Sequence, residues 1–296
     1  MTRHRFIGYL FALASAALVG FFTVLNKWLL VEDVPALTAG AWTYLAAGLS
    51  LLPWALRARG LHFKRPYAMA FWLLAGSVLG PSLYFVGLLL TSGVEGVLLI
   101  NTEAVFTALL AFLFFKERLS SKAIAGSIAI IAGAVWMSWT GDSLFSANAL
   151  GNLLIALGYL GWATENNFGR LLGEDIPAVT LVCFKALVAG IVMALLAIGF
   201  GQPIAVSWRV VPGIVASGAA SLGLSLALFY MAMRYIGAAR TGLVAATSTL
   251  WGVLGAVVLI GESLTQNVIV GGILMLLGVL GFALEQEQMQ TTAAES

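Results

Sequence analysis

Charged residues are scarce in this chain: Asp, Glu, Lys and Arg make up 9% of its 296 residues, against about 25% in an ordinary soluble domain. Hydrophobic residues make up 61%, and a chain of this size cannot bury so much apolar surface away from water. These proportions exclude a soluble enzyme, a nucleic-acid-binding protein and a disordered scaffold. The formal net charge of +2 is also too small to indicate a nucleic-acid partner. The sequence therefore predicts a protein whose solvent is the lipid bilayer.

Residues that carry common catalytic or metal chemistry are also few. Cys183 is the single cysteine, which excludes an intramolecular disulfide and a cysteine-based metal site. His4 and His62 belong to no His-Glu-x-x-His motif, and the dipeptide Gly-Lys of a phosphate-binding loop does not occur. Aspartate is found only in or near predicted loops, with no cluster suited to a metal and a diphosphate. We therefore expect no enzyme, no catalytic residue, no metal site and no cofactor.

Ten stretches are long and apolar enough to cross the hydrocarbon core as helices, which takes roughly 20 residues. Because lipid offers the backbone no hydrogen-bonding partner, closed helices are the expected form. The predicted fold class is an all-α integral membrane protein with ten transmembrane helices. The expected spans are 6–30, 36–56, 67–90, 94–115, 123–139, 149–169, 178–200, 210–233, 240–260 and 268–284.

Positive charge is distributed unequally between the two sets of connecting loops. With the N-terminus in the cytoplasm, twelve of the fifteen Lys and Arg residues fall on the inner side, which is the bias expected of membrane proteins. We therefore expect a multi-pass protein of a bacterial-type inner (plasma) membrane with both termini in the cytoplasm. The twelve residues are Arg3, Arg5, Arg57, Arg59, Lys64, Arg65, Lys116, Arg118, Lys122, Arg170, Arg234 and Arg240.

The two halves of the chain repeat one pattern. At an offset of 145 residues Glu117 aligns with Glu262 and Ser120 with Thr265, and the match continues for more than 30 residues. Ser120 and Thr265 are placed to cap the helices that follow them. The same offset pairs Thr102 with Thr247, Phe106 with Trp251, Leu119 with Leu264, Gly126 with Gly271, and Gly133 with Gly278.

Weaker matches extend the repeat toward the start of each half. Asn26 aligns with Asn167 at an offset of 141, and Thr38 with Thr180 at an offset of 142. Each half holds five spans, and an odd number makes the second copy enter the membrane from the opposite side. The prediction is two inverted five-helix repeats, 1–141 and 148–296, within one membrane domain. Inverted repeats place a binding site between the halves near the bilayer midplane.

The block Phe115-Lys116-Glu117-Arg118-Leu119-Ser120 and its partner Gly261-Glu262-Ser263-Leu264-Thr265 resemble those of the EamA-type drug/metabolite transporter superfamily. The resemblance covers nearly the whole chain. It implies a proton- or gradient-driven secondary carrier. In each repeat the first four helices would line a central cavity, with the fifth helix outside it. The aromatic residues, including Trp162, are most similar to those of the YddG-type aromatic amino acid exporters.

Three ionisable residues lie deep in the predicted spans: Glu103, Glu165 and Lys185. A charge at the bilayer centre costs about 2.5–3.5 kcal/mol even on the lenient insertion scale, so each of them requires a reason to be there. Each serves either as an interhelical strut in a static charge pair or as part of a binding or coupling site. The sequence leaves both alternatives open.

Tryptophans separate into two groups by depth. Trp162 lies deep and shares a helix face with Glu165, and Trp42 and Trp251 are also deep. The others lie near span ends and are expected in the interfacial belt: Trp28, Trp54, Trp72, Trp136, Trp139 and Trp208. The expected substrate-binding residues are Tyr84, Asn101, Glu103, Trp162, Glu165, Lys185, Tyr230 and Trp251.

Pro81 removes a backbone donor inside the third span and prevents a regular helix there. The eighth span has no internal proline, so the two halves are expected to differ in stiffness.

Together these features predict a secondary active transporter of small organic solutes, and the family resemblance implies that it is an exporter. Amino acids with aromatic or other apolar side chains are the expected substrates, carried by alternating access at a central cavity. The alternative is a broad-specificity metabolite or cationic drug exporter that uses Glu103 or Glu165 as the counter-charge. A membrane-embedded enzyme or a channel is less favoured. We expect a monomer in the lipid bilayer, with a small-molecule substrate, protons as the candidate coupling ion and no nucleic acid.

Overall fold

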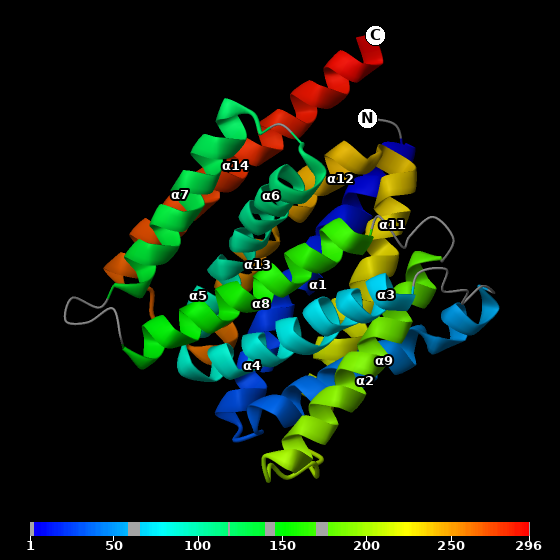
Figure 1. The fold of residues 1–296 in the computed structure, drawn as a ribbon, viewed down its shortest axis with the longest axis vertical. Helices are drawn as coiled ribbons and strands as arrows, with labels where there is room; N and C mark the ends of the chain where they lie inside the picture. Colours follow the sequence, from blue (N-terminus) through cyan, green and yellow to red (C-terminus); the bar gives the residue numbers. More distant parts are fainter. Residues whose placement is uncertain (1–2, 59–65, 118, 140–145, 170–176, 296) are drawn as a thin grey trace.

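The structure is a computed structural model that describes residues 3–58, 66–117, 119–139, 146–169 and 177–295. Over these ranges the regular secondary structure is helical (Figure 1). The first half comprises α1 (Arg3–Val31), α2 (Ala36–Arg57), α3 (Pro66–Leu73), the π-helix η1 (Leu74–Leu79), α4 (Gly80–Leu90), α5 (Gly93–Leu98), the 3₁₀-helix η2 (Leu99–Asn101), α6 (Thr102–Phe115) and α7 (Ser121–Ser138).

The second half repeats the order of the first six elements and then differs, since a π-helix follows α13. It comprises α8 (Ala147–Gly169), α9 (Ala178–Gly199), α10 (Val211–Val215), the π-helix η3 (Ala216–Leu224), α11 (Ser225–Ile236), α12 (Ala238–Ala245), α13 (Ser248–Gly255), the π-helix η4 (Ala256–Ile260) and α14 (Gln266–Glu295).

The expectation of ten membrane helices is confirmed. Seven helices in the described part are long and apolar enough to cross a membrane by length and composition. The three other predicted spans correspond to α2, α8 and the first part of α14. The start of α1 and the end of α14 lie at the same end of the bundle (Figure 1). We call this end the N-side and the opposite end the far side.

Helix packing shows the inverted repeat directly. The second helices of the two halves, α2 and α9, pack against each other, and so do the fifth helices, α7 and α14. The first helix of each half packs on the third span of the other half: α1 on α11, and α8 on α4. This reciprocal exchange of partners confirms the two inverted five-helix repeats.

The repeated block has the same local structure in both halves. Lys116 and Gly261 end the fourth spans in the left-handed conformation, with φ of 55° and 75°. The amides of the next residues, Glu117 and Glu262, donate to the Ala111 and Ala256 carbonyl oxygens, both at 3.3 Å. The predicted caps are also confirmed, because Ser120 and Thr265 accept from amides of the following helices at 3.1 and 3.3 Å.

The two block glutamates lie at opposite ends of one membrane span. Glu117 directly follows α6 at its C-terminal end. The Glu262 carboxylate accepts hydrogen bonds at the start of α5, from the Gly93 and Val94 amides. Because α5, η2 and α6 form the continuous fourth span, Glu117 lies on the N-side and Glu262 on the far side, as an inverted duplication requires.

Glycines bring the fifth helices of the two repeats into backbone contact. A Cβ atom added to Gly133 on α7 would lie 2.5 Å from the Gly271 carbonyl oxygen on α14, and one on Gly271 would lie 2.6 Å from the Gly133 oxygen. Small residues that let backbones approach are typical of helix pairs in membranes, where no hydrophobic driving force joins helices. The predicted Gly-spaced helices therefore have a packing role outside the cavity.

Replacing Gly133 with alanine is expected to lower the free energy of unfolding by about 1–3 kcal/mol, because the helices must separate to admit the methyl group. Thermal unfolding of the purified protein in detergent measures the change. Gly199→Ala is the matched control, since no atom lies within 4 Å of a Cβ added there. Equal melting temperatures for the two variants would contradict this account of the α7–α14 contact.

The third and eighth spans both contain a π-helical segment. In the third span the Gly80 amide donates to the Ala75 carbonyl, five residues back, just before Pro81. In the eighth span the Ser225 amide donates to the Ala220 carbonyl in the same way, with no proline at that position. The irregularity predicted at Pro81 is therefore confirmed, and the eighth span has one that the sequence did not predict. The eighth span is irregular without a proline because η3 packs closely on α2. A Cβ atom added to Gly218 would lie 2.2 Å from the Thr43 carbonyl oxygen.

Candidate functional site

A cavity of about 310 Å³ lies between the two repeats. The first half contributes residues of α1, α2, η2 and α6 to its wall, and the second half contributes residues of α8, α9, η3 and α11. The lining residues of α8 come from its C-terminal half, and those of α9 from its N-terminal half. The cavity therefore extends from the middle of the bundle toward the N-side. The fifth helices, α7 and α14, contribute no residue to the described lining.

Aromatic side chains form one wall of the cavity. The Trp162 ring lies 5.0 Å from the ring of Tyr159, measured between centroids, and 5.4 Å from that of Tyr84. Tyr159 and Trp162 line the cavity, as do Phe22, Tyr44 and Phe229. Tyr84 is fully buried behind them. This wall suits an apolar or aromatic group of a ligand, because aromatic rings present large rigid apolar surfaces.

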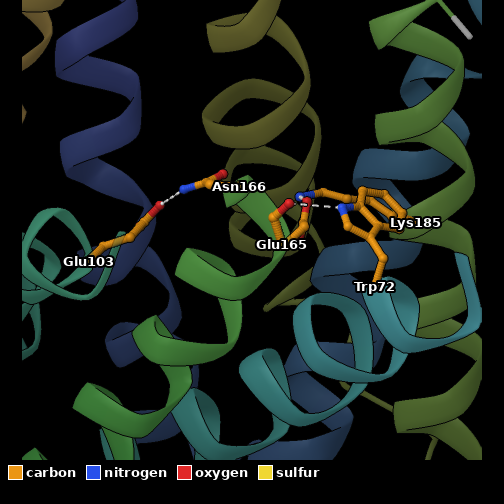
Figure 2. A network of polar contacts seen from close by, with 5 residues as sticks. All are labelled: Trp72, Glu103, Glu165, Asn166 and Lys185. Carbon is orange, nitrogen blue, oxygen red and sulfur yellow. Dashed lines mark hydrogen bonds and ion pairs between the residues drawn. The ribbon is translucent and has the colours of Figure 1, made fainter. Parts of the chain in front are cut away.

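An ion pair joins α8 to α9 at the cavity wall. The Lys185 ammonium group contacts the Glu165 carboxylate (Figure 2). Glu165 is 7% exposed, and a Cβ added to Gly76 on η1 would collide with its carboxylate. Glycine at position 76 thus leaves the space that the Glu165 side chain occupies.

Trp72 lies behind this pair rather than in the interfacial belt. It is 2% exposed, and its indole N–H donates to the Glu165 carbonyl oxygen at 3.0 Å (Figure 2). Its expected place in the belt is wrong, because α3 packs on α8 and this contact covers the indole. The residue holds the backbone of α8 at the position of the ion pair.

A second carboxylate, Glu103, lines the cavity from α6. The Asn166 side-chain amide donates to Glu103 Oε1 at 2.7 Å. Asn166 points toward α6 and its neighbour Glu165 points toward α9 (Figure 2). Adjacent residues of α8 thus reach two different helices, and the cavity wall carries two carboxylates and one ammonium group.

Four of the eight predicted binding residues line the cavity: Glu103, Trp162, Glu165 and Lys185. Tyr84 is outside the lining, but its hydroxyl donates a hydrogen bond to the lining residue Thr23 at 2.9 Å.

The other three lie elsewhere. Asn101 is 7% exposed, and its side-chain oxygen accepts from Thr249 at 3.4 Å. Tyr230 is 41% exposed and lies outside the cavity lining, while Trp251 packs over Gly20 of α1. Asn101 and Tyr230 share helices with lining residues but present other faces, whereas Trp251 lies on α13, which contributes no residue to the described lining.

Several lining residues were not predicted, namely Phe22, Tyr44, Tyr159, Asn166 and Phe229. Helical spacing contains a signal for two of them. Tyr159 precedes Trp162 by three residues and Asn166 follows it by four, so all three share one helix face. Phe22, Tyr44 and Phe229 are aromatic residues on mostly apolar helices, where an aromatic side chain is equally expected in helix packing or facing lipid.

The far side is closed by a hydrogen-bonded polar cluster. The Glu262 carboxylate accepts from the Gly93 and Val94 amides at 2.6 and 2.8 Å. The Lys27 ammonium group donates to the Leu88 and Thr91 carbonyls at 3.0 and 2.6 Å. These contacts connect α1, α4 and the end of the ninth span to the start of α5. The helices are therefore closely packed on the far side, at the opposite end of the bundle from the N-side part of the cavity.

Glu95 belongs to the same far-side region and was also not predicted. Ser92 and Glu95 form a reciprocal capping box at the start of α5, and Glu95 is 5% exposed. Its sequence signal is the Ser-x-x-Glu pattern that precedes an apolar run.

No group of three His, Cys, Asp or Glu side chains in the described ranges is placed to hold a metal ion.

Comparisons with known proteins identify relatives over nearly all of the chain. The profile of the EamA-like transporter family matches twice, over residues 6–139 and 149–284. An uncharacterized transporter of Methanothermobacter thermautotrophicus is 28% identical over 294 residues, covering 93% of this chain and 85% of its own length. The uncharacterized transporter YetK of Bacillus subtilis is 27% identical over 60% of this chain and 56% of its own length. A solved crystal structure matches with a TM-score of 0.66 at 19% identity, covering 94% of this chain and 96% of that one.

Proposed function

The chain belongs to the EamA-like transporter family, and from that premise we propose that it is a secondary active exporter of small organic solutes. The solutes carry an ammonium group and an apolar body, and amino acids with aromatic or other apolar side chains are the first candidates. The observation that carries this proposal is the cavity between the repeats, where an aromatic wall adjoins Glu103, Glu165 and Lys185.

Both parts of such a solute find a chemical match in the cavity. The apolar body contacts Tyr159 and Trp162, and the carboxylates of the wall attract the ammonium group. The carboxylate of an amino acid would bind Lys185, which lies in the same wall. Nucleotide sugars are disfavoured, because a diphosphate requires several cations and Lys185 is the single cation in the described lining.

A second candidate, a broad-specificity exporter of metabolites or cationic drugs, is favoured by one observation. The lining holds two carboxylates and one ammonium group, so the cavity has an excess of negative charge when both carboxyl groups are ionised. A monocation compensates this excess and a zwitterion does not.

The proposed mechanism is alternating access between the two repeats. In the conformation described, the cavity extends toward the N-side and the far-side cluster closes the other end. Rocking of one repeat against the other carries the site to the far side. The distribution of Lys and Arg supports a cytoplasmic N-side, so we interpret this conformation as an inward-facing state. We propose a monomer in an inner (plasma) membrane.

Cysteine labelling tests the proposed orientation. Arg57 at the end of α2 and Asp33 in the turn after α1 are both described. Five of the inner cations lie outside the described residues, namely Arg59, Lys64, Arg65, Arg118 and Arg170. In a chain with Cys183 replaced by serine, Arg57→Cys is expected to react with a membrane-impermeant reagent from the cytoplasm and Asp33→Cys from outside. Both positions are exposed. The reverse pattern would overturn the charge-bias assignment.

Transport into proteoliposomes tests the proposed function. The purified protein is reconstituted with an internal pool of unlabelled L-phenylalanine, and uptake of the labelled amino acid is followed with and without a pH gradient. A carrier is expected to show saturable counterflow that other aromatic amino acids compete with. A panel of organic cations in the same assay tests the second candidate. Uptake that neither saturates nor shows counterflow would indicate a channel and contradict the proposal.

A further inference from the structure

The charges of the cavity are unequally partnered. Lys185 contacts Glu165, whereas Glu103 receives one hydrogen bond, from the neutral side-chain amide of Asn166 at 2.7 Å. Among the described residues that line the cavity, Lys185 is the single cation. Glu103 is therefore the carboxylate whose negative charge has no counter-ion in this wall.

These charges also break the symmetry of the repeat. At the offsets of the aligned helices, Glu165 corresponds to Val24, Lys185 to Thr43 and Glu103 to Ser248. All three counterparts are uncharged and buried, with 0%, 0% and 8% exposure. Thr43 donates to the side-chain oxygen of Asn26 at 2.9 Å, within a neutral hydrogen-bonded contact between α1 and α2.

The asymmetry has a consequence for the transport cycle. Inverted repeats exchange conformations when the site changes sides, so in the other state the N-side adopts the closed packing that the far side has here. Glu103 would then be buried as Ser248 is now. Burying an uncompensated carboxylate is strongly unfavourable, so Glu103 must be neutralised before the N-side closes.

We propose that Glu103 is a shared binding site for the ammonium group of the substrate and for one proton, and that one of the two must occupy it before the cavity closes on the N-side. This inference rests on the proposed function. On binding, the O–H bond of the Glu103 carboxylic acid breaks, the proton leaves to water, and the ammonium N–H groups donate to the carboxylate oxygens. Release of the substrate on the other side is followed by return of a proton, which gives exchange of one proton per substrate.

The neighbours of Glu103 favour it over Glu165 for this role. Glu165 is 7% exposed and contacts Lys185, whereas Glu103 contacts no cation among the described residues that line the cavity. The titratable groups that share the cavity with Glu103 are Glu165 and Tyr159 on α8, Lys185 on α9 and Tyr44 on α2. The helix α7, which also packs on α6, has Lys122 in its first turn as its one titratable residue.

The position of Asn166 indicates the kind of molecule that fits. Asn166 and Trp162 are four residues apart on α8, so they lie one helical turn, roughly 5–6 Å, from each other on one face. An ammonium group at Glu103 and Asn166 thus places an aromatic body against Trp162 when a short aliphatic chain joins the two. Aromatic amines and aromatic amino acids have this form.

A series of indole compounds that differ in charge tests the inference on the purified protein. Tryptamine is a cation, L-tryptophan a zwitterion and indole-3-propionate an anion, with the same ring in each. Binding of tryptamine to the wild type is expected to weaken by up to about tenfold for each unit that the pH is lowered, because a proton competes. In weakly buffered solution, about one proton is released per tryptamine bound at low pH. Indole-3-propionate is expected to bind most weakly.

Glu103→Gln is the decisive variant. It is expected to weaken tryptamine binding at least about tenfold, to abolish proton release and to remove the pH dependence. Glu103→Asp keeps a carboxyl group and is expected to keep proton release, even if its affinity falls. Glu32→Gln, the same change on an exposed glutamate outside the cavity, is the matched control and should behave as the wild type.

Two further outcomes separate this inference from the proposed function. Wild-type affinity and proton release in Glu103→Gln, with counterflow of amino acids intact, would overturn the role of Glu103 and leave the transporter proposal standing. Absence of binding and counterflow for both tryptamine and the amino acids in the wild type would overturn both. If Glu103→Gln does not fold, loss of proton release in a folded Glu103→Asp would contradict the inference.

Discussion

Replacing Lys185 with alanine is expected to lower the free energy of unfolding by about 3–5 kcal/mol, because the change leaves Glu165 as a buried charge without its counter-ion. The Glu165 side chain is 9% exposed and that of Lys185 is 23% exposed, so water does little to compensate the loss. On the other side, Gly76 packs against the Glu165 side chain and Trp72 donates a hydrogen bond to the Glu165 carbonyl oxygen. Thermal unfolding of the purified variant in detergent measures the effect.

A double variant separates the buried charge from other effects of the substitution. Combining Lys185→Ala with Glu165→Gln removes both charges, and most of the stability is expected to return, since the remaining amide requires far less solvation than a carboxylate. Lys185→Ala alone with an unchanged melting temperature would show that the ion pair contributes nothing to folding. That result would exclude a structural role for Lys185 as an interhelical strut and leave a role in substrate binding.

Replacing Trp162 with alanine is expected to weaken substrate binding by roughly 5- to 150-fold, which corresponds to the loss of about 1–3 kcal/mol of apolar contact. Trp162 lines the cavity from the same face of α8 as Tyr159 and Asn166. Trp162→Phe keeps part of the aromatic surface and is expected to recover part of the affinity. Binding of L-tryptophan to the purified protein measures each step.

Melting temperature must be measured on the same samples, because Trp162 also packs against the buried ring of Tyr84. If Trp162 has only a packing role, alanine lowers stability and leaves the affinity of the folded protein unchanged. Trp208→Ala is the matched control, since Trp208 is 79% exposed and lies outside the cavity. Unchanged affinity in Trp162→Ala would remove this residue from the binding site.

Much of the architecture could be predicted because it depends on properties that each segment carries by itself. Length and hydropathy determine which stretches cross a membrane. The Glu-x-Leu-[Ser/Thr] block repeats at one offset, and its left-handed residue, amide contact and cap recur in the structure at Lys116 and Gly261. The cost of charge in lipid singled out Glu103, Glu165 and Lys185, and the structure places all three in the cavity wall.

The partners of these residues depend on which helices become neighbours, and the sequence has no local signal for that. Glu165 contacts Lys185 and Asn166 contacts Glu103 because α8 lies between α6 and α9. The same rule applies to Tyr230, whose helix lines the cavity through Phe229 while Tyr230 lies outside the lining. It applies also to Trp251, whose helix α13 contributes no residue to the described lining, and to Trp72, which α8 covers. A helix face becomes a cavity wall only relative to the helices that pack around it.

Composition and residue spacing therefore account for the solvent of this protein, its ten spans, its inverted repeat and the identity of its deep charges. Tertiary packing decided the aromatic wall, the π-helix of the eighth span and the pairing that leaves Glu103 without a counter-ion among the described lining residues. The physical reason is that hydropathy, capping and charge cost act within a segment. Burial, ion pairing and helix irregularity are instead decided by atoms of other segments, such as the Thr43 carbonyl that lies against Gly218.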